Sequence, residues 1–168
     1  MAEAKKGLVT RDKKVAFMQV SGATDGTYTR MTKFTEMSKS SNANEYSRKY
    51  VDQPGEDSDV TGYSPSYSYA FDQYVGNAVH DDIVKITDNE LVGDDAVRTI
   101  IVVDFTQPGT TEGSYKAKKR QYSVIPDSDG DDENTYTYSG DLKSKGVSTD
   151  VVVTTSDDWA TCKESAGA

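Results

Sequence analysis

The residues best suited to catalysis in this chain are its single histidine and its single cysteine. His80 is followed by Asp81 and Asp82, and a histidine beside a carboxylate can act as half of a general-base pair. No Ser or Cys in a recognisable nucleophile setting accompanies it, and a general base also requires a substrate pocket. We therefore interpret His80 as a surface or edge histidine, and Cys162 as a small side chain near the end of the chain.

An acidic stretch, "DSDGDDEN" at residues 127–134, invites comparison with a calcium-binding loop. An EF-hand loop requires Gly at its sixth position and Glu at its twelfth. Counting from Asp127, Gly130 falls at the fourth position and Tyr138 at the twelfth, so the register does not match. The stretch is instead typical of a solvated turn between strands. The sequence has no glycine-rich phosphate loop either, and we expect no metal, no cofactor and no enzymatic activity.

One basic cluster stands out in a chain whose formal net charge is −9. It lies in "YKAKKRQY" and comprises Lys116, Lys118, Lys119 and Arg120, between Tyr115 and Tyr122. Aromatic side chains beside cations can stack the bases of a single-stranded nucleic acid. A chain this acidic repels phosphate, however, which favours contact between the cluster and acidic turns of a neighbouring copy, such as Asp127–Glu133.

Length and composition indicate one domain, spanning residues 1–168, with a core built largely on aromatic side chains. Only 35% of the residues are hydrophobic, but 11 Tyr and 4 Phe supply a large buried area per residue, which favours a packed sheet. Residues 1–14 are charged and aperiodic and predict an N-terminal arm, while residues 162–168 predict a frayed tail. A single cysteine excludes an internal disulfide and favours a reducing compartment. We see no export signal and no apolar run of about 18 residues, and so expect no membrane insertion.

Two alternating segments predict a long hairpin. In "GYSPSYSYAFDQY", residues 62–74, Tyr67, Tyr69 and Phe71 share one face, and Ser66, Ser68, Ala70 and Asp72 share the other. In the segment around residues 45–50, Tyr46, Arg48 and Tyr50 alternate with Glu45, Ser47 and Lys49. The connection between the two segments is rich in acid and turn residues, namely Asp52, Pro54, Gly55, Glu56, Asp57 and Asp59. It is longer than closure requires, which is typical of a loop that makes a contact.

The remaining elements predict a mainly β fold with one flanking helix. Apolar residues recur at helical spacing over about residues 78–91, with Asn77 as the cap and Gly93 as the end. Strands are expected over residues 15–20, 96–105 and 114–125, and a last pair over 135–144 and 147–155 turns at Lys145 and Gly146. The architecture expected from this order is a β-sandwich or half-open barrel.

The order of these segments resembles that of a known family. The run "EYSRKYVDQPGEDSDVTGYSPSYSYAFDQYVGNAVHDDIVKITDNELVGDDAVRTIIVVDF" is similar to the major tail tube proteins of long-tailed bacteriophages and phage tail-like particles. The similarity covers about residues 15–106 well and the C-terminal part only in general character. It implies a tail-tube-type β-sandwich or half-barrel that forms hexameric rings, which stack into a tube with a continuous β-barrel lining through which the genome leaves.

This resemblance gives the alternating strands an expected role. The small and acidic side chains Ser47, Ser66, Ser68 and Asp72 would face the lumen, so that DNA slides past without specific binding. The acidic connection and the basic cluster would then contact other subunits or rings. The resemblance also implies tape-measure and tail terminator or tail-tip partners, assembly in the host cytoplasm and a place in the virion tail.

A different function class remains open from the residues alone. A carbohydrate-binding or adhesive β-sandwich would use solvent-facing tyrosines to stack on sugars. That interpretation requires several aromatic side chains on one exposed face, whereas most of those found here alternate with Ser as core positions do. Electron microscopy of the purified protein at high concentration separates the two readings, because only the first predicts tubes.

Overall fold

The computed structural model describes residues 6–22 and 26–165 and is mainly β with one α-helix in this part of the chain. Its strands are β1 (Lys14–Met18), β2 (Thr27–Arg30), β3 (Phe34–Ser40), β4 (Ala43–Lys49), β5 (Glu56–Tyr63), β6 (Ser66–Asp72), β7 (Val97–Pro108), β8 (Tyr115–Asp129), β9 (Thr137–Thr154) and β10 (Thr161–Glu164). The helix is α1 (Ala78–Asp88), and two 3-10 turns are η1 (Arg11–Lys13) and η2 (Gly93–Ala96). The predicted fold class, mainly β with one helix, is confirmed.

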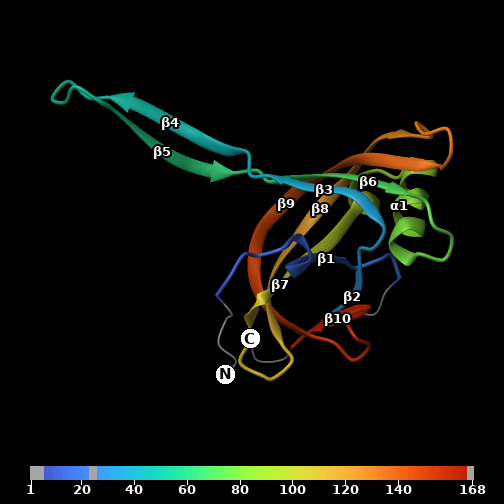
Figure 1. Cartoon of the computed structure of the whole chain (residues 1–168). Helices are drawn as coiled ribbons and strands as arrows, with labels where there is room; N and C mark the ends of the chain where they lie inside the picture. The colour runs from blue at the N-terminus through green and yellow to red at the C-terminus, as the bar shows by residue number, and fades with distance from the viewer. Residues whose placement is uncertain (1–5, 23–25, 166–168) are drawn as a thin grey trace.

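Eight strands form one sheet that curls into a barrel (Figure 1). Their order is β10-β2-β1-β7-β8-β9-β6-β3, all neighbours being antiparallel, and β10 also pairs with β9. This extra pairing closes the strands from β10 to β9 into a ring. Strands β6 and β3 continue the sheet beyond β9, and α1 lies beside them. The part of the predicted N-terminal arm that precedes residue 6 lies outside the described residues.

Strand β9 corrects the expectation of a hairpin at Lys145 and Gly146. Both residues lie inside one continuous strand, Thr137–Thr154. Lys119 pairs with Thr149 while Gln121 pairs with Lys145, so β9 has extra residues at this point and forms a bulge. Gly146 supplies the positive φ of 83° that the bulge requires. The bend lets the first part of β9 pair with β6 and its end pair with β10.

Two apolar clusters fill the fold. The first packs β6, α1 and neighbouring strands together, and Tyr69, Phe71 and Ile83 are almost fully buried in it. The second lies within the barrel and includes Phe17 and Cys162. Because Cys162–Glu164 belong to β10, the predicted frayed tail is wrong for these residues. Residues 166–168 lie outside the described part of the chain.

Helix α1 begins where the sequence predicts and ends earlier. The Asn77 side-chain oxygen accepts hydrogen bonds from the N–H groups of Val79 and His80, at 3.2 and 3.3 Å, which caps the helix. The helix ends at Asp88 rather than near residue 91, and Gly93 opens the turn η2. Hydrogen bonds to terminal carbonyls, such as that of Asn89 N–H to Lys85 O, complete this end.

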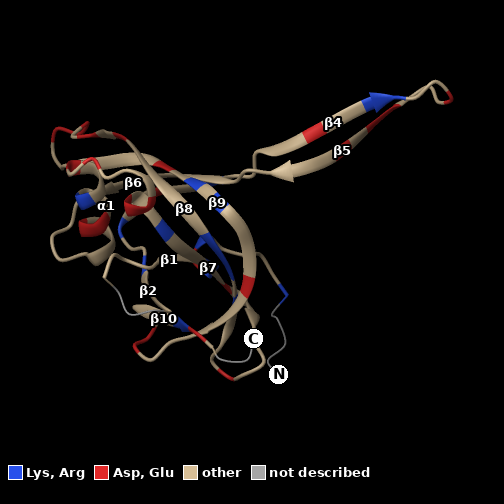
Figure 2. Cartoon of the chain, turned by 180° about the vertical axis from the view of Figure 1, so that it is seen from behind, with Lys and Arg blue, Asp and Glu red and all other residues tan. Residues whose placement is uncertain are grey.

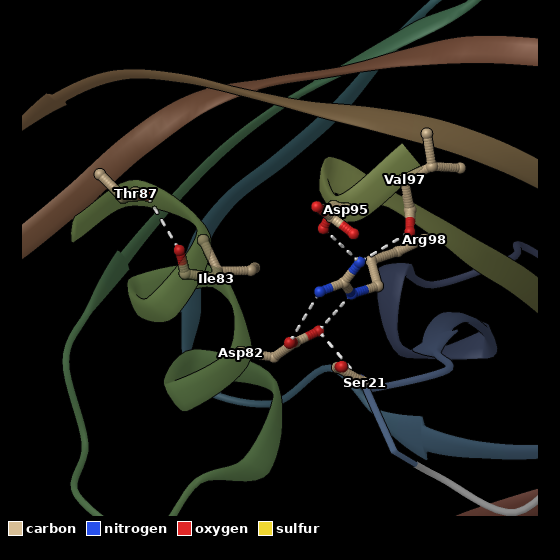
Figure 3. Close-up of polar contacts among 7 residues, drawn as sticks. All are labelled: Ser21, Asp82, Ile83, Thr87, Asp95, Val97 and Arg98. Atoms are coloured by element: carbon tan, nitrogen blue, oxygen red, sulfur yellow. Dashed lines mark hydrogen bonds and ion pairs between the residues drawn. The ribbon is translucent and has the colours of Figure 1, made fainter. Parts of the chain in front are cut away.

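A buried ion pair fixes α1 to β7 (Figure 3). Arg98 donates from Nε and Nη2 to the two carboxylate oxygens of Asp82, at 2.6 and 3.0 Å. The Arg98 Nη1 also donates to the carbonyl oxygens of Asp95 and Val97, and the Ser21 N–H donates to Asp82. Both charged side chains are less than one-tenth exposed. The pair is therefore satisfied in place, and loss of either partner would leave the other charge buried.

The expectation that His80 is a surface or edge residue is wrong. Its side chain is completely buried and stacks on Phe71, with ring centroids 4.2 Å apart. The imidazole Nδ1 accepts a hydrogen bond from the Tyr74 N–H at 3.2 Å, and Nε2 donates to the Thr32 carbonyl oxygen at 2.9 Å. These roles correspond to a neutral ring protonated at Nε2. His80 thus joins the loop before α1 to the segment before β3.

Burial of His80 predicts a loss of stability in mild acid. Desolvation lowers the pKa of this imidazole below its usual value of about 6.5, although Thr32, Asp81 and Asp72 act in the opposite direction. In mild acid the unfolded chain therefore binds a proton on His80 more readily than the folded chain does. As a result, the free energy of unfolding falls as the pH drops below about 6.5. Denaturant unfolding of the wild type and of His80→Gln between pH 5 and 7 measures this. We expect the variant to be less stable throughout, with a flatter pH dependence; an equal slope in both proteins would contradict the assignment.

Candidate functional site

No group of three or more His, Cys, Asp or Glu side chains that could hold a metal ion occurs within residues 6–22 and 26–165. In the acidic stretch after Pro126, the carboxylates serve the turn itself. Asp132 accepts a hydrogen bond from the Asn134 N–H, and the Tyr136 and Ser128 hydroxyls donate to Asp129 and Asp131. No helix in the described chain is long and apolar enough to cross a membrane. Three surfaces contain the residues that the sequence singled out.

The first surface is a hairpin of β4 and β5 that projects away from the barrel (Figure 1). The sequence predicted that the strand around Tyr46 would pair with the strand around Tyr67, and this pairing is wrong. β4 pairs with β5, while β6 pairs with β3 and β9. The strand is interrupted between β5 and β6 at Ser64–Pro65, because proline has no N–H to donate to a neighbouring strand. Opposite this interruption Asn42 adopts a positive φ.

The predicted acidic connection is consequently shorter than expected. Its residues Glu56, Asp57 and Asp59 belong to β5 and stand opposite Lys49, Arg48 and Tyr46 respectively. The remaining members, Asp52, Pro54 and Gly55, form the turn at the end of the hairpin. We call residues 50–59 the hairpin tip.

Every residue of β4, and all but one of β5, is exposed. Ser47 lies with Glu45 and Ser58 on one face of the hairpin and hydrogen-bonds to both at 2.7 Å. Tyr50 is 49% exposed, and Val51 at the turn is fully exposed. A two-stranded hairpin without a packed face is at best marginally stable in water. This hairpin therefore has the properties of an arm that packs against another molecule.

The second surface is the outer face of the sheet formed by β3, β6, β9 and the end of β8. The predicted alternation in β6 is confirmed, since Tyr67, Tyr69 and Phe71 are buried. Opposite to them lies a face made mostly of small hydroxyl side chains, which we call the serine face: Ser38, Ser40, Ser66, Ser68, Ser139, the acidic Asp141 and the basic Lys143, which pairs with Ser66. The Ser68 hydroxyl donates to Asp141 at 3.2 Å. Asp72, at the end of β6, accepts from the Thr135 hydroxyl at 3.1 Å.

The third surface contains part of the basic cluster of β8, whose residues lie on two faces of the strand. Lys119 forms an ion pair with Glu164 at 2.6 Å, and this pair, with the hydroxyl of Tyr28, lowers the pKa of Glu164. Lys116, Lys118 and Arg120 point to the other face, where they line a cavity of about 890 Å³ together with Lys14 and Lys39. We call this cavity the cationic groove. Lys14 and Lys39 were not singled out from the sequence, because only the pairing of distant strands brings them beside β8.

Charge is unevenly distributed over these surfaces. Figure 2 shows Lys and Arg along β8 and its neighbours and at the outer end of β4, and acidic residues on the hairpin and in the turns. In the groove, Lys14 pairs with Asp104 at 3.7 Å and Lys118 pairs with Asp150. A cationic cavity in a chain of net charge −9 is a local feature that the overall composition does not predict.

No family model matches the chain, and no curated protein matches it either. Among solved structures, the chain is similar to a chain in the cryo-EM structure of the anti-feeding prophage baseplate, which was symmetrised six-fold. The alignment covers 88% of this chain and 97% of that chain, with 5% sequence identity and a TM-score of 0.49. At these values the similarity carries no conclusion about function.

Proposed function

We propose that this chain is a structural protein of a phage tail or tail-like particle, and that it polymerises as stacked hexameric rings into a tail tube. The observation that carries the proposal is the almost entirely exposed β4–β5 hairpin, which continues the β3 and β6 strands outward from the barrel (Figure 1). An arm that buries almost nothing within its own subunit gains stability when a neighbouring subunit covers it.

The sheet that bears the serine face has two strand edges suited to pairing with other subunits. β3 pairs on one side only, with β6, and the Val124–Asp129 part of β8 pairs with β9 but not with β7. Open edges can bind strands of another chain. Head-to-tail pairing of β3 from one subunit with β8 of the next would generate a ring lined by one continuous sheet.

In such a ring the serine face lines the bore. Ser66 and Ser68 are short and uncharged, and Asp72 is acidic, as is Asp141 beside them. DNA binds non-specifically to proteins through Lys and Arg that displace its counterions, and this face presents few of them. A genome would therefore slide past without specific binding. Ser47, on the hairpin, would extend the same small polar lining.

This function places the protein in the virion tail after assembly in the host cytoplasm. Its partners would be further copies of itself, a tape-measure protein in the bore, and a terminator or tip protein at the tube ends. The alternative, a carbohydrate-binding module, has less support, because Tyr67, Tyr69, Tyr122 and Tyr138 are buried in the core rather than presented to a sugar.

Electron microscopy of the purified protein over a range of concentrations tests the proposal. We expect rings and tubes of constant diameter whose length grows with protein concentration, because strand pairing and hairpin contacts are intermolecular. Monodisperse single subunits at all concentrations would contradict it.

A further inference from the structure

The cationic groove contains positive charge that its own subunit does not neutralise. Five basic side chains line it, and only two carboxylates, Asp104 and Asp150, accompany them. Those carboxylates pair with Lys14 and Lys118. Lys39 and Lys116 have no ion-pair partner within the described chain, and the third unpaired cation is Arg120.

Arg120 gives the clearest sign that the groove is incomplete. Its Nε is buried and has no hydrogen-bond partner in the described structure. A buried polar atom without a partner is costly, more so when it belongs to a charged group.

The groove also offers apolar contacts. Val102, Val151 and Val152 line it alongside the lysines, and Tyr63 at the root of the hairpin contributes a side chain that is 63% exposed. A suitable occupant therefore combines carboxylates with at least one apolar side chain.

The hairpin tip has this composition. It contains Asp52, Glu56, Asp57 and Asp59, of which Asp57 and Glu56 stand opposite Arg48 and Lys49 of β4 whereas Asp52 and Asp59 face no basic residue across the hairpin, and its exposed apolar side chains are Tyr50 and Val51. The tip points away from the barrel in both views, so it does not reach the groove of its own subunit (Figures 1 and 2).

We propose that the hairpin tip of one subunit docks into the cationic groove of a second copy. Carboxylates of the tip neutralise Lys39 and Lys116 and provide an acceptor near Arg120, while Val51 packs on the valines of the groove. This inference rests on the proposed self-assembly and specifies one of its contacts. Because tip and groove are different surfaces, the contact is head-to-tail, and the rotation that relates the two subunits decides whether it closes a ring or extends a stack.

This docking replaces the partner expected from sequence for the basic cluster. Three carboxylates of the acidic turn after Pro126 are engaged locally, Asp132 by the Asn134 N–H and Asp131 and Asp129 by the Ser128 and Tyr136 hydroxyls. The tip carboxylate Asp52 is exposed and has no ion-pair partner within the described residues.

Charge reversal on the two surfaces tests the docking. The groove variant carries Lys39→Glu and Lys116→Glu, and the tip variant carries Asp52→Lys and Asp59→Lys; sedimentation measures the polymer fraction. We expect each variant to lower this fraction at least tenfold at low salt, and the combined variant to recover most of it. The tip variant is the decisive one, because it makes the chain less acidic, and relief of general repulsion alone would increase its assembly.

A matched control changes the other acidic turn by Asp131→Lys and Glu133→Lys, which alters the net charge equally, and should assemble at least as well as the wild type. If this control fails to assemble while the tip variant assembles normally, the turn is the partner and the docking is wrong. If wild type and both reversal variants polymerise equally, the groove receives no tip, although the proposed tube function stands. If the wild type never polymerises, the proposed function fails, and the docking fails with it.

Cross-linking checks the contact directly. Val51 is fully exposed at the tip, Ser148 lines the groove, and the native Cys162 is buried. A chain with Val51→Cys and Ser148→Cys, treated with a short bismaleimide after polymerisation, should give a ladder of covalent oligomers, and either single variant should give almost none. Polymers that yield no ladder would overturn the docking and leave the proposed function in place.

Discussion

A chain in which an Asn-Gly turn replaces residues 42–64 will fold but will not polymerise. The replacement removes β4, β5 and their connection and joins β3 directly to β6, whose pairing ends at Ser40 and Ser66. Asn-Gly suits the tight turn of a two-residue hairpin. None of the buried core residues lies within 42–64, so the barrel loses no packing.

The expected result is a monomer at concentrations where the wild type is largely polymeric, with a melting temperature close to that of the wild-type subunit. Sedimentation velocity gives the polymer fraction, and circular dichroism on heating gives the stability. As a matched control, Ser47→Ala and Ser58→Ala remove the hydroxyl pair of the hairpin without shortening it, and should leave polymerisation intact. Normal tubes from the shortened chain would show that the hairpin is dispensable for assembly.

Asp82→Ala will cause the largest loss of stability among single substitutions considered for this protein. It leaves the Arg98 guanidinium buried without the two hydrogen bonds that it donates to the Asp82 carboxylate (Figure 3). Breaking a buried pair by removing one partner costs about 3–5 kcal/mol, whereas surface changes cost about 0.5 kcal/mol or less. The free energy of unfolding by urea should fall by that larger amount.

The neighbouring Asp81 supplies the matched control, because it lies one position along α1 and is exposed. Asp81→Ala should cost less than about 1 kcal/mol, the range of a carboxylate interacting with the helix dipole. Replacement of both partners, by Asp82→Leu with Arg98→Met, should restore much of the stability lost in Asp82→Ala. If Asp82→Ala and Asp81→Ala are equally mild, the pair does not hold the helix on the sheet.

The parts of the fold that sequence could predict are those governed by local periodicity. Alternation of Tyr67, Tyr69 and Phe71 with small residues predicted the buried face of β6, and the Asn77 cap predicted the start of α1. Gly146 was read as a turn because a glycine with positive φ serves a turn or a bulge equally well, and only the register across β8 distinguishes them.

Burial of polar residues depended on partners distant in the chain. The buried His80 donates a hydrogen bond from Nε2 to the carbonyl oxygen of Thr32, which is far from it in sequence, and no local pattern predicts that contact. A signal for Asp82 did exist, since it lies at helical spacing from the buried Val79 and Ile86 and so faces the core. For the basic cluster of β8 a signal also existed. Alternation along a strand places Lys119 on the opposite face from Lys118 and Arg120, so the cluster does not form one surface.

Cryo-EM reconstruction of the polymerised wild-type protein tests the central claim most directly. We predict a closed ring with a continuous bore lined by the serine face, including Ser66, Ser68 and Asp72, with the cationic groove away from the bore. A filament without a bore, or a bore lined by Lys116 and Arg120 of the groove, would contradict the assignment of this chain as the wall of a conduit for DNA.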